Sequence, residues 1–283
     1  EPGVSPRLDP PAARSPSAWQ ALCAYFSPSA ISIRPLVLLA LGLHLLLWTL
    51  LTGVSHSAPD ADNMEQLVWG NVLQWGYQKH PPLPSWVIHA LASVFGRQVW
   101  ITFFAAQLSV TLAFYFIWRL GCEMTSPRKA FIAVLLTMPI AYFTTRGVMS
   151  NHNTLQLWSI AGALWMFYRA WRWQNLRDWL LLGMFCGFAV LTKYSVGVWF
   201  LVFALQLLLT GSLRDARTWK GVAAGAAVLV LMVLPHALWL YDVDVVRHDP
   251  RNPLHYALFA GRFESNSRLQ NLVALYYMLT TNL

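Results

Sequence analysis

The sequence "DADNMEQLVWGNVLQWGYQKHPPLPSW", residues 60–86, is a polar stretch with a strongly apolar run on either side. It gathers two aspartates, a glutamate, a lysine–histidine pair and three prolines in a chain that is 57% hydrophobic and only 11% charged. A composition of this kind, with the apolar residues in long runs, is typical of a membrane protein. The polar stretch therefore lies beside a bilayer, and its charges need an explanation.

Seven apolar runs outside this stretch are candidates for membrane-spanning helices, because about 20 helical residues cover the ~30 Å of a hydrocarbon core. They predict an all-α polytopic membrane protein. The apolar residues 269–283 predict a truncated eighth span, and we expect the chain to be part of a longer protein with a further C-terminal portion. The seven runs cover residues 35–51, 99–120, 130–143, 154–171, 179–191, 196–209 and 221–241.

The basic residues give the chain an orientation. Residues 1–34 have little periodicity and predict a disordered cytoplasmic leader, which places residues 35–283 in one transmembrane domain. With the N-terminus in the cytoplasm, the inner loops collect most of the arginines and lysines, as the positive-inside rule expects. The net charge of +8 is explained in this way and not by nucleic acid, and residues 60–86 fall on the outer side. The inner basic residues are Arg7, Arg14, Arg34, Arg119, Arg128, Lys129, Arg169, Arg172, Arg177, Arg214, Arg217 and Lys220.

Within the polar stretch, residues 62–75 predict a helix with Met64, Val68, Val72 and Trp75 on its membrane-facing side. Asp62, Glu65, Gln66 and Trp69 fall on an adjoining arc. The prolines of "HPPLP" end the helix, because each lacks an N–H donor and biases its predecessor away from helix. Residues 85–95 are too short to span and predict a second interfacial helix, hinged to the first at residues 81–84.

Three motifs in order resemble the polyprenyl-phosphate-sugar-dependent membrane glycosyltransferases of the C-type fold, which include protein O-mannosyltransferases and the bacterial aminoarabinose transferase. The first is an acid after the first span followed by "WGY" and "KHPPL"; the others are "LLGMFCGFAVLTKYSVGVWF" at residues 181–200 and "LPHALWL" at residues 234–240. Glu65-Gln66 and His152 bring the chain nearest to a bacterial branch with lipopolysaccharide-core uronic-acid transferases. The resemblance covers residues 36 to about 262.

The resemblance implies a C-type transmembrane fold with interfacial helices in the first external loop, in the bacterial inner membrane with the active site facing the periplasm. It also implies an inverting transfer of sugar from a polyprenyl-phosphate donor to a lipid or glycan acceptor, such as lipid A or lipopolysaccharide core, and less readily to protein. Asp62 would be the base that activates the acceptor hydroxyl. Because relatives read Asp-Glu where this chain has Asp62-Asn63, Asp60 is an alternative base, and Glu65 completes the catalytic candidates.

Each candidate residue also has a simpler interpretation. Asp62 and Glu65 fit a capping box at a helix start, and a lysine near a membrane surface usually contacts lipid phosphate with its charge at the interface. The resemblance instead predicts phosphate contacts, which would stabilise charge that develops as the glycosidic bond breaks. The candidates for binding the donor phosphate are Lys79, His80, Lys193, Tyr194 and Arg146, and those for binding the sugar or acceptor are His152, His236 and Trp69.

Two other classes of protein remain as alternatives. A polyprenyl-linked lipid or solute carrier would show paired internal repeats, which the sequence lacks. A non-catalytic isoprenoid-phosphate-binding protein is kept open by the missing second carboxylate at position 63. A divalent metal could use Asp62 and Glu65, but Gln78 stands where a further acidic ligand is wanted, so we expect no metal and no other cofactor.

Overall fold

The computed structural model describes residues 33–56, 59–247, 249 and 253. The expected leader, apart from residues 33 and 34, and the expected eighth span lie outside the described residues. Within the described part every regular element is a helix. The first of them, α2 (Ile33–Ser55), begins two residues before the predicted start of the transmembrane domain.

Each of the seven apolar runs contains a helix. Three helices are long and apolar enough to cross a membrane: α2, α5 (Trp100–Met124) and α11 (Ala216–Tyr241), the last with its extension to Asp244. The chain is thus an all-α polytopic membrane protein. The other four runs form shorter helices of 11 to 17 residues, which are α6 (Pro127–Thr137), α8 (Leu157–Trp173), α9 (Leu176–Val190) and α10 (Gly197–Leu209).

Helix α6 is shorter than the predicted run, which extended to residue 143. It ends at Thr137, and residues 138–149 form turns. Met138 still has helical backbone and donates to the Val134 carbonyl, but Pro139 after it lacks the N–H that would continue the helix. The sequence predicted a helix in this apolar run correctly, but the predicted range did not allow for the end of the helix at the proline.

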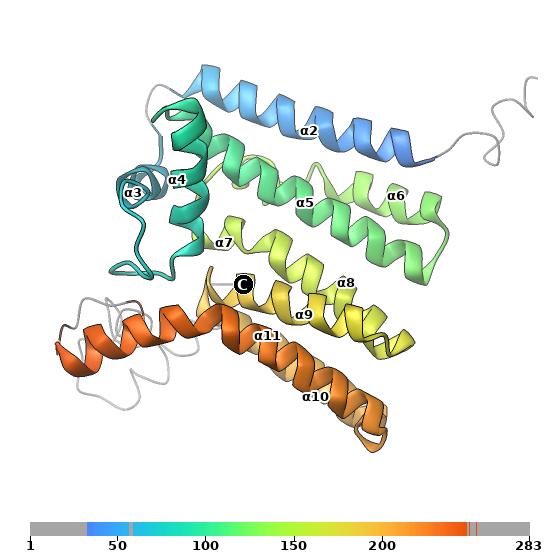
Figure 1. The fold of residues 1–283 in the computed structure, drawn as a ribbon. Coiled ribbons are helices and arrows are strands. Elements are labelled where there is room, and N and C mark those ends of the chain that lie inside the picture. Colours follow the sequence, from blue (N-terminus) through green and yellow to red (C-terminus); the bar gives the residue numbers. More distant parts are fainter. Residues whose placement is uncertain (1–32, 57–58, 248, 250–252, 254–283) are drawn as a thin grey trace, which may run out of the picture.

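The long helices lie side by side, and α3 (Ala61–Trp69) and α4 (Leu83–Phe95) lie together across one end of the bundle (Figure 1). Neighbouring pairs are α2 with α5, α5 with α8, α8 with α9, and α9 with α11. Helices α9 and α11 approach so closely that a Cβ at Gly183 would overlap the backbone of Gly225. Small residues at such crossings are typical of helices packed in membranes.

Two apolar cores hold the bundle together. One lies among α2, α5 and α6 around Val37, Phe114 and Val134, and the other lies among α8, α9 and α10 around Phe167, Phe185 and Phe203. The outer face of α2 is apolar as well, with side chains that are 57% to 63% exposed, as expected for contact with lipid. The exposed leucines of α2 include Leu38, Leu39, Leu43, Leu46, Leu47 and Leu50.

Helix α3 ends at Trp69, with Gly70 as its C-cap residue, before the predicted end at Trp75. Here α4 crosses it closely, since a Cβ on Gly70 would lie 3.1 Å from Ile88 and 3.3 Å from the backbone nitrogen of His89. The His89 ring also forms a 2.8 Å hydrogen bond with the Gly70 carbonyl at the helix end. Tertiary contact therefore ends the helix, and propensity alone could not show it. The predicted membrane-facing residues of this segment are exposed, as Met64, Val68, Val72 and Trp75 show.

The proline-rich link before α4 interrupts the helical backbone as predicted, although the last of its three prolines lies inside α4. Helix α4 begins at Leu83, so Pro84 lies in its first turn. Proline is tolerated there because its missing N–H has no partner inside the helix. The link itself is attached to the bundle, since the Leu83 N–H donates to the Leu191 carbonyl at 2.9 Å.

Candidate active site

A polar cavity of about 200 Å³ lies at the end of the bundle where α3 and α4 cross. Its walls come from the first turns of α3, from the link before α4, from the start of α7 (His152–Leu155), and from the chain just after α9. These segments are far apart in sequence, so only the fold brings them together. The cavity is lined by Asp62, Glu65, Gln66, His80, Asn151, His152, Asn153 and Lys193.

Lys193 reaches the cavity because the helix before it stops. Helix α9 ends at Val190, and Lys193 has extended backbone (φ −160°, ψ 135°) before the short 3-10 helix η1 (Tyr194–Val196). Its Nζ donates to the Asn153 Oδ1 at 2.5 Å. The predicted place of Lys193 at the end of an apolar helix, on the same side as Asp62, is what the structure shows. Its role in binding phosphate stays a prediction.

Asp62 lies in the first turn of α3, half-buried, and its Oδ2 accepts a 3.1 Å hydrogen bond from the Asn151 side-chain amide. The capping-box interpretation is wrong. The residue at the N-cap position is Asp60, and its side chain makes no capping hydrogen bond. Asp60 is exposed and is not among the cavity residues, so of the two aspartates the structure brings Asp62 to the cavity.

Glu65 forms an ion pair with Lys79, with 2.6 Å between Oε1 and Nζ. It does not turn back to the start of α3, as a capping box would require. The side chains of Lys79 and Glu65 are 39% and 22% exposed, so the pair sits at the rim of the cavity. The pair places the ammonium group of Lys79 beside the cavity wall that His80 forms.

His80 and His152 are stacked, with ring centroids 3.7 Å apart. Burial lowers the pKa of His80 to about 3, and the positive charges of Lys193 and Lys79 act in the same direction. The pKa of His152 is likewise lowered, first by burial and then by His80 and Lys193. Both rings are therefore neutral near pH 7. The Trp69 ring meets the edges of both histidines and stacks on Tyr77, with centroids 5.5 Å apart.

A buried amide network positions this end of α3. Asn63 is fully buried; its Nδ2 donates to the Thr102 Oγ1 at 2.8 Å, and its Oδ1 accepts from the Ser150 N–H at 2.9 Å. Gln66, also buried, accepts from the Ser85 hydroxyl at 2.9 Å. These bonds tie α3 to α4, to α5 and to the chain before α7. In the sequence, Asn63 drew attention only because similar proteins have an acid at this position. The structure shows that an amide fits here because it donates one hydrogen bond and accepts another.

His236 and Tyr194 are not among the residues that line the cavity; they contact each other beside it. The Tyr194 hydroxyl and the His236 Nε2 are 2.7 Å apart, and the His236 Nδ1 is 2.5 Å from the Trp75 carbonyl. Trp239 packs over Gly76 in the same loop. The motif at residues 234–240 thus fastens α11 to the loop between α3 and α4, next to the cavity.

Arg146 is exposed and is not among the cavity residues; its Nη1 lies 3.9 Å from the Met149 sulfur. Sequence reasoning missed Asn151, Asn153 and Gln66, which line the cavity. The first two flank His152 in "NHN", and this clustering of polar residues between two apolar runs was the available signal.

The geometry defines a polar cavity whose wall contains two carboxylates and one ammonium group. Lys193 lines it and Lys79 lies at its rim, while the side chain that donates to Asp62 is a neutral amide. A carboxylate in such a cavity can accept a proton from a bound hydroxyl. Such a site, at the end of a helical membrane bundle, suits group transfer from a lipid-linked phosphate.

Residues 79–239 match the family described as dolichyl-phosphate-mannose-protein mannosyltransferase, and the chain belongs to this family. The family resemblance seen in the sequence motifs is thereby confirmed. The matched segment includes Lys79, His80, His152 and Lys193 of the cavity, and begins after Asp62.

The curated proteins that are similar to the chain are also named as sugar transferases. The chain is 28% identical over 187 residues to the lipopolysaccharide core galacturonosyltransferase RgtA of Rhizobium johnstonii, covering 64% of the chain and 37% of that protein. It is 26% identical over 200 residues to the lipid A galacturonosyltransferase RgtD of the same species, covering 66% of the chain and 40% of that protein.

A third relative is the undecaprenyl phosphate-alpha-4-amino-4-deoxy-L-arabinose arabinosyl transferase of Pseudomonas savastanoi. It is 28% identical over 138 residues, which are 47% of the chain and 25% of that protein. The chain thus spans two fifths or less of the length of these relatives. No solved structure matches the chain.

Proposed function

We propose that this protein is an inverting glycosyltransferase that moves a sugar from a polyprenyl-phosphate donor to an envelope acceptor, on the periplasmic face of the bacterial inner membrane. One observation carries the proposal. The fold brings Asp62, which precedes the matched region, and Lys193, which lies within it, to the wall of one cavity at one end of an apolar helical bundle.

The transfer is a single displacement. The acceptor hydroxyl oxygen attacks the anomeric carbon from the face opposite the phosphate, forming the new glycosidic bond as the carbon–oxygen bond to the phosphate breaks. The electron pair of that bond leaves with the polyprenyl phosphate, and the hydroxyl proton passes to the Asp62 carboxylate. Attack from the opposite face inverts the anomeric centre.

The cations hold the leaving phosphate. Lys193 and Lys79 offer charge-assisted hydrogen bonds to a group that gains negative charge in the transition state. His80, neutral by its lowered pKa, contributes a hydrogen bond and not a charge. With two ammonium groups in these places, the transfer needs no divalent metal to stabilise the phosphate.

The three acidic candidates then have different roles. Asp62, whose partner is the Asn151 amide, is the base. Glu65 is a positioning residue, because it pairs with Lys79 at 2.6 Å. Asp60 is exposed at the N-cap position of α3 and takes no part.

The isoprenoid chain of the donor needs an apolar place between helices. A second cavity of about 280 Å³ lies among α8, α9, α10 and α11, and nearly all of its lining is apolar. Aromatic side chains such as Phe200 and Phe203 form part of its wall. Helix α10, which carries both, begins four residues after Lys193, so a chain anchored by its phosphate at Lys193 could follow α10 into this cavity.

The activities for which the relatives are named support the donor and acceptor classes. One relative is named for an undecaprenyl phosphate sugar, and two are named for lipopolysaccharide core and lipid A. We therefore favour a lipopolysaccharide or lipid A acceptor over a protein. A lipid carrier or a non-catalytic isoprenoid-phosphate-binding protein would bind the same phosphate but would have no use for a base at Asp62.

The test is transfer of radiolabelled sugar from a polyprenyl phosphate to lipid A or lipopolysaccharide core by the purified full-length protein. Asp62→Asn should lower the rate by about 10²- to 10⁴-fold, the usual contribution of a general base. Asp60→Asn is the matched control and should transfer at the rate of the unchanged protein. Full activity in Asp62→Asn would exclude the assigned base, and no transfer by the unchanged protein to any envelope acceptor would favour the two alternatives.

A further inference from the structure

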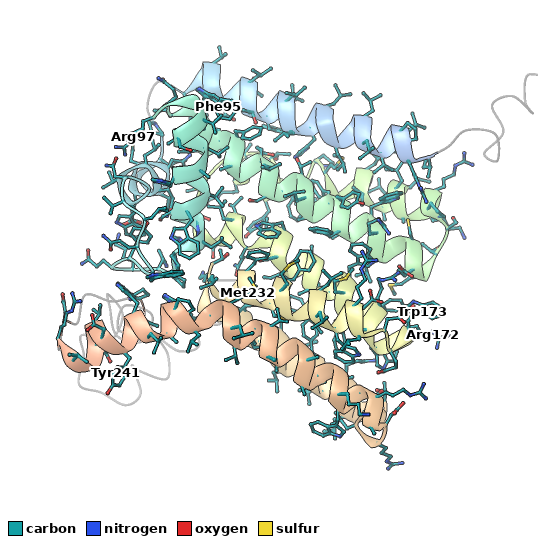
Figure 2. The ribbon with its side chains drawn as sticks, viewed as in Figure 1. Phe95, Arg97, Arg172, Trp173, Met232 and Tyr241 are labelled. Carbon is teal, nitrogen blue, oxygen red and sulfur yellow. The ribbon has the colours of Figure 1, made fainter. Side chains whose placement is uncertain are left out.

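A second polar cavity, of about 540 Å³, lies at the opposite end of the bundle from the candidate active site. It is enclosed by the last turns of α5 and α8 and by the first turn of α9. Figure 2 labels Arg172 and Trp173 at this end, and Phe95 and Arg97 at the end where α3 and α4 lie. We call this cavity the arginine pocket; it is lined by Arg119, Trp165, Met166, Arg169, Asn175, Leu176, Arg177, Asp178 and Leu181.

The positive charge of the arginine pocket exceeds what its acids neutralise. Arg169 is held by Glu123, with 2.6 Å between Nη1 and Oε1, and by Asp178, with 3.3 Å between Nε and Oδ1. Both acids therefore act on the same guanidinium. Arg119 and Arg177 add two further positive charges to the lining, and the only acid among the lining residues is Asp178.

Arg119 is held in place by neutral contacts. Its guanidinium carbon lies 4.4 Å from the centroid of a Trp165 ring, and its Nη1 donates to the Tyr115 hydroxyl at 3.0 Å. A guanidinium stacked on an aromatic face keeps its charge and keeps other N–H donors for an anion. The arginine is thus oriented without being neutralised.

Arg177 lies in the first turn of α9, whose N-terminus opens into the arginine pocket. The partial positive charge of a helix N-terminus favours an anion there. Arg177 is exposed, so its guanidinium can reach a ligand at the mouth of the pocket. Arg119 of α5, Arg177 of α9 and the N-terminus of α9 therefore all line the arginine pocket.

The apolar part of the lining indicates that the anion belongs to a lipid. Trp165, Met166 and Leu181 lie beside the arginines, and Leu176 is 58% exposed at the same place. Arg119 lies in the last two turns of α5, a helix long and apolar enough to span the membrane, which places the pocket at headgroup depth. Basic pockets between helices at this depth suit phospholipid headgroups.

We propose that the arginine pocket binds the phosphate of an anionic phospholipid of the leaflet opposite the candidate active site, with Arg119 and Arg177 as its ligands. A phosphate oxygen accepts from each guanidinium, and the glycerol and upper acyl chains cover Leu176 and Leu181. A headgroup with an added ammonium fits less well, because that group would face arginines. The proposal does not depend on the glycosyltransferase activity.

The test uses purified full-length protein and measures lipid retention by native mass spectrometry, with phosphatidylglycerol, phosphatidylcholine and soluble glycerol phosphate as separate probes. We expect one phosphatidylglycerol to be retained, and Arg119→Gln with Arg177→Gln to weaken its binding by at least about tenfold, the effect of one lost hydrogen bond to a charged group. The matched control is Arg172→Gln, an exposed arginine at the same end that is not part of the pocket lining.

Each outcome decides the proposal. Because Arg119→Gln also removes a contact with Trp165, the exposed Arg177→Gln is measured alone, with the thermal unfolding of each variant as a check on folding. Equal retention of phosphatidylglycerol by Arg177→Gln, by the double variant and by the unchanged protein would overturn the proposal. Equal binding of phosphatidylcholine would overturn the choice of an anionic lipid, and equal binding of glycerol phosphate would show a site for free phosphate instead of lipid.

Discussion

The two ends of the helical bundle hold similar charged residues in opposite arrangements. At the end where α3 and α4 cross, Asp62 accepts from the Asn151 amide, and Lys193 donates to the Asn153 amide. At the other end, Arg169 is bound by both Glu123 and Asp178. The first end holds Asp62 and Lys193 with neutral amides beside the Glu65–Lys79 ion pair, and the other end pairs both Glu123 and Asp178 directly with one arginine.

This difference is the basis for the roles that we propose for the acids. An acid paired with arginine has its negative charge compensated and serves to hold helices together. An acid held by a neutral amide keeps its orientation without losing its capacity for a proton. The acid that we propose as the base, Asp62, is the one that accepts from a neutral amide, that of Asn151.

The largest expected effect on stability comes from placing a charge where the site end uses a neutral amide. In Asn63→Asp, the donor to Thr102 is lost and a carboxylate oxygen faces the Thr102 oxygen, whose own hydroxyl donates to the Val99 carbonyl at 2.7 Å. We expect a loss of about 3 kcal/mol in the free energy of unfolding, because a buried group is left without its partner.

Thermal and denaturant unfolding in detergent would measure this loss. Asn71→Asp makes the same chemical change at an exposed position just after α3 and should leave unfolding unchanged. Equal unfolding curves for Asn63→Asp and the unchanged protein would show that the amide network does not hold α3.

A smaller effect is expected from removing one carboxylate charge at each end. Glu65→Gln frees Lys79 from its ion pair and should lower sugar transfer about tenfold, with little change in stability, because the pair is partly exposed. Asp178→Asn at the other end should lower the melting temperature and leave transfer unchanged. If Glu65→Gln changed stability alone, or Asp178→Asn changed transfer in folded protein, the two ends would not differ as described.

The effect that is smallest at neutral pH, and that grows as the pH falls, is a pH dependence of stability from the stacked histidines. The folded-state pKa values of His80 and His152 lie below the usual 6.5, so the unfolded chain binds protons that the folded chain does not. Stability should therefore fall as the pH drops below about 6.5, by at most about 1.4 kcal/mol per pH unit for each histidine.

Melting temperatures between pH 7.5 and 5.0 would show this slope. His152→Gln removes one of the titrating rings and should flatten it, whereas His56→Gln, at an exposed position, should not. A slope that is unchanged in His152→Gln would mean that burial does not keep these rings neutral.

The sequence was sufficient for the membrane class and for most of the cavity wall. Apolar runs locate helices well, because their length and composition are local properties. Lys193 could be placed at a helix end for the same reason. Asp62 and His152 came from the family resemblance together with their positions between apolar runs.

The features that the sequence did not reveal depend on contacts between distant segments. Helix α3 stops at Trp69 because α4 crosses it at Gly70, and Glu65 turns to Lys79 instead of capping the helix. The capping-box pattern is a valid local rule, but here Glu65 forms an ion pair with Lys79 instead of a capping hydrogen bond. Asn63 could be recognised as an organiser only once Thr102 and Ser150 were placed around it.

The most direct test of the account separates phosphate binding from proton transfer in the same cavity. Binding of undecaprenyl phosphate to purified full-length protein would be measured for the unchanged protein, for Lys193→Met and for Asp62→Asn. The account predicts binding at least about tenfold weaker in Lys193→Met, from the loss of a charge-assisted contact, and binding as tight or tighter in Asp62→Asn. Unchanged binding in Lys193→Met, or lost binding in a folded Asp62→Asn, would contradict it.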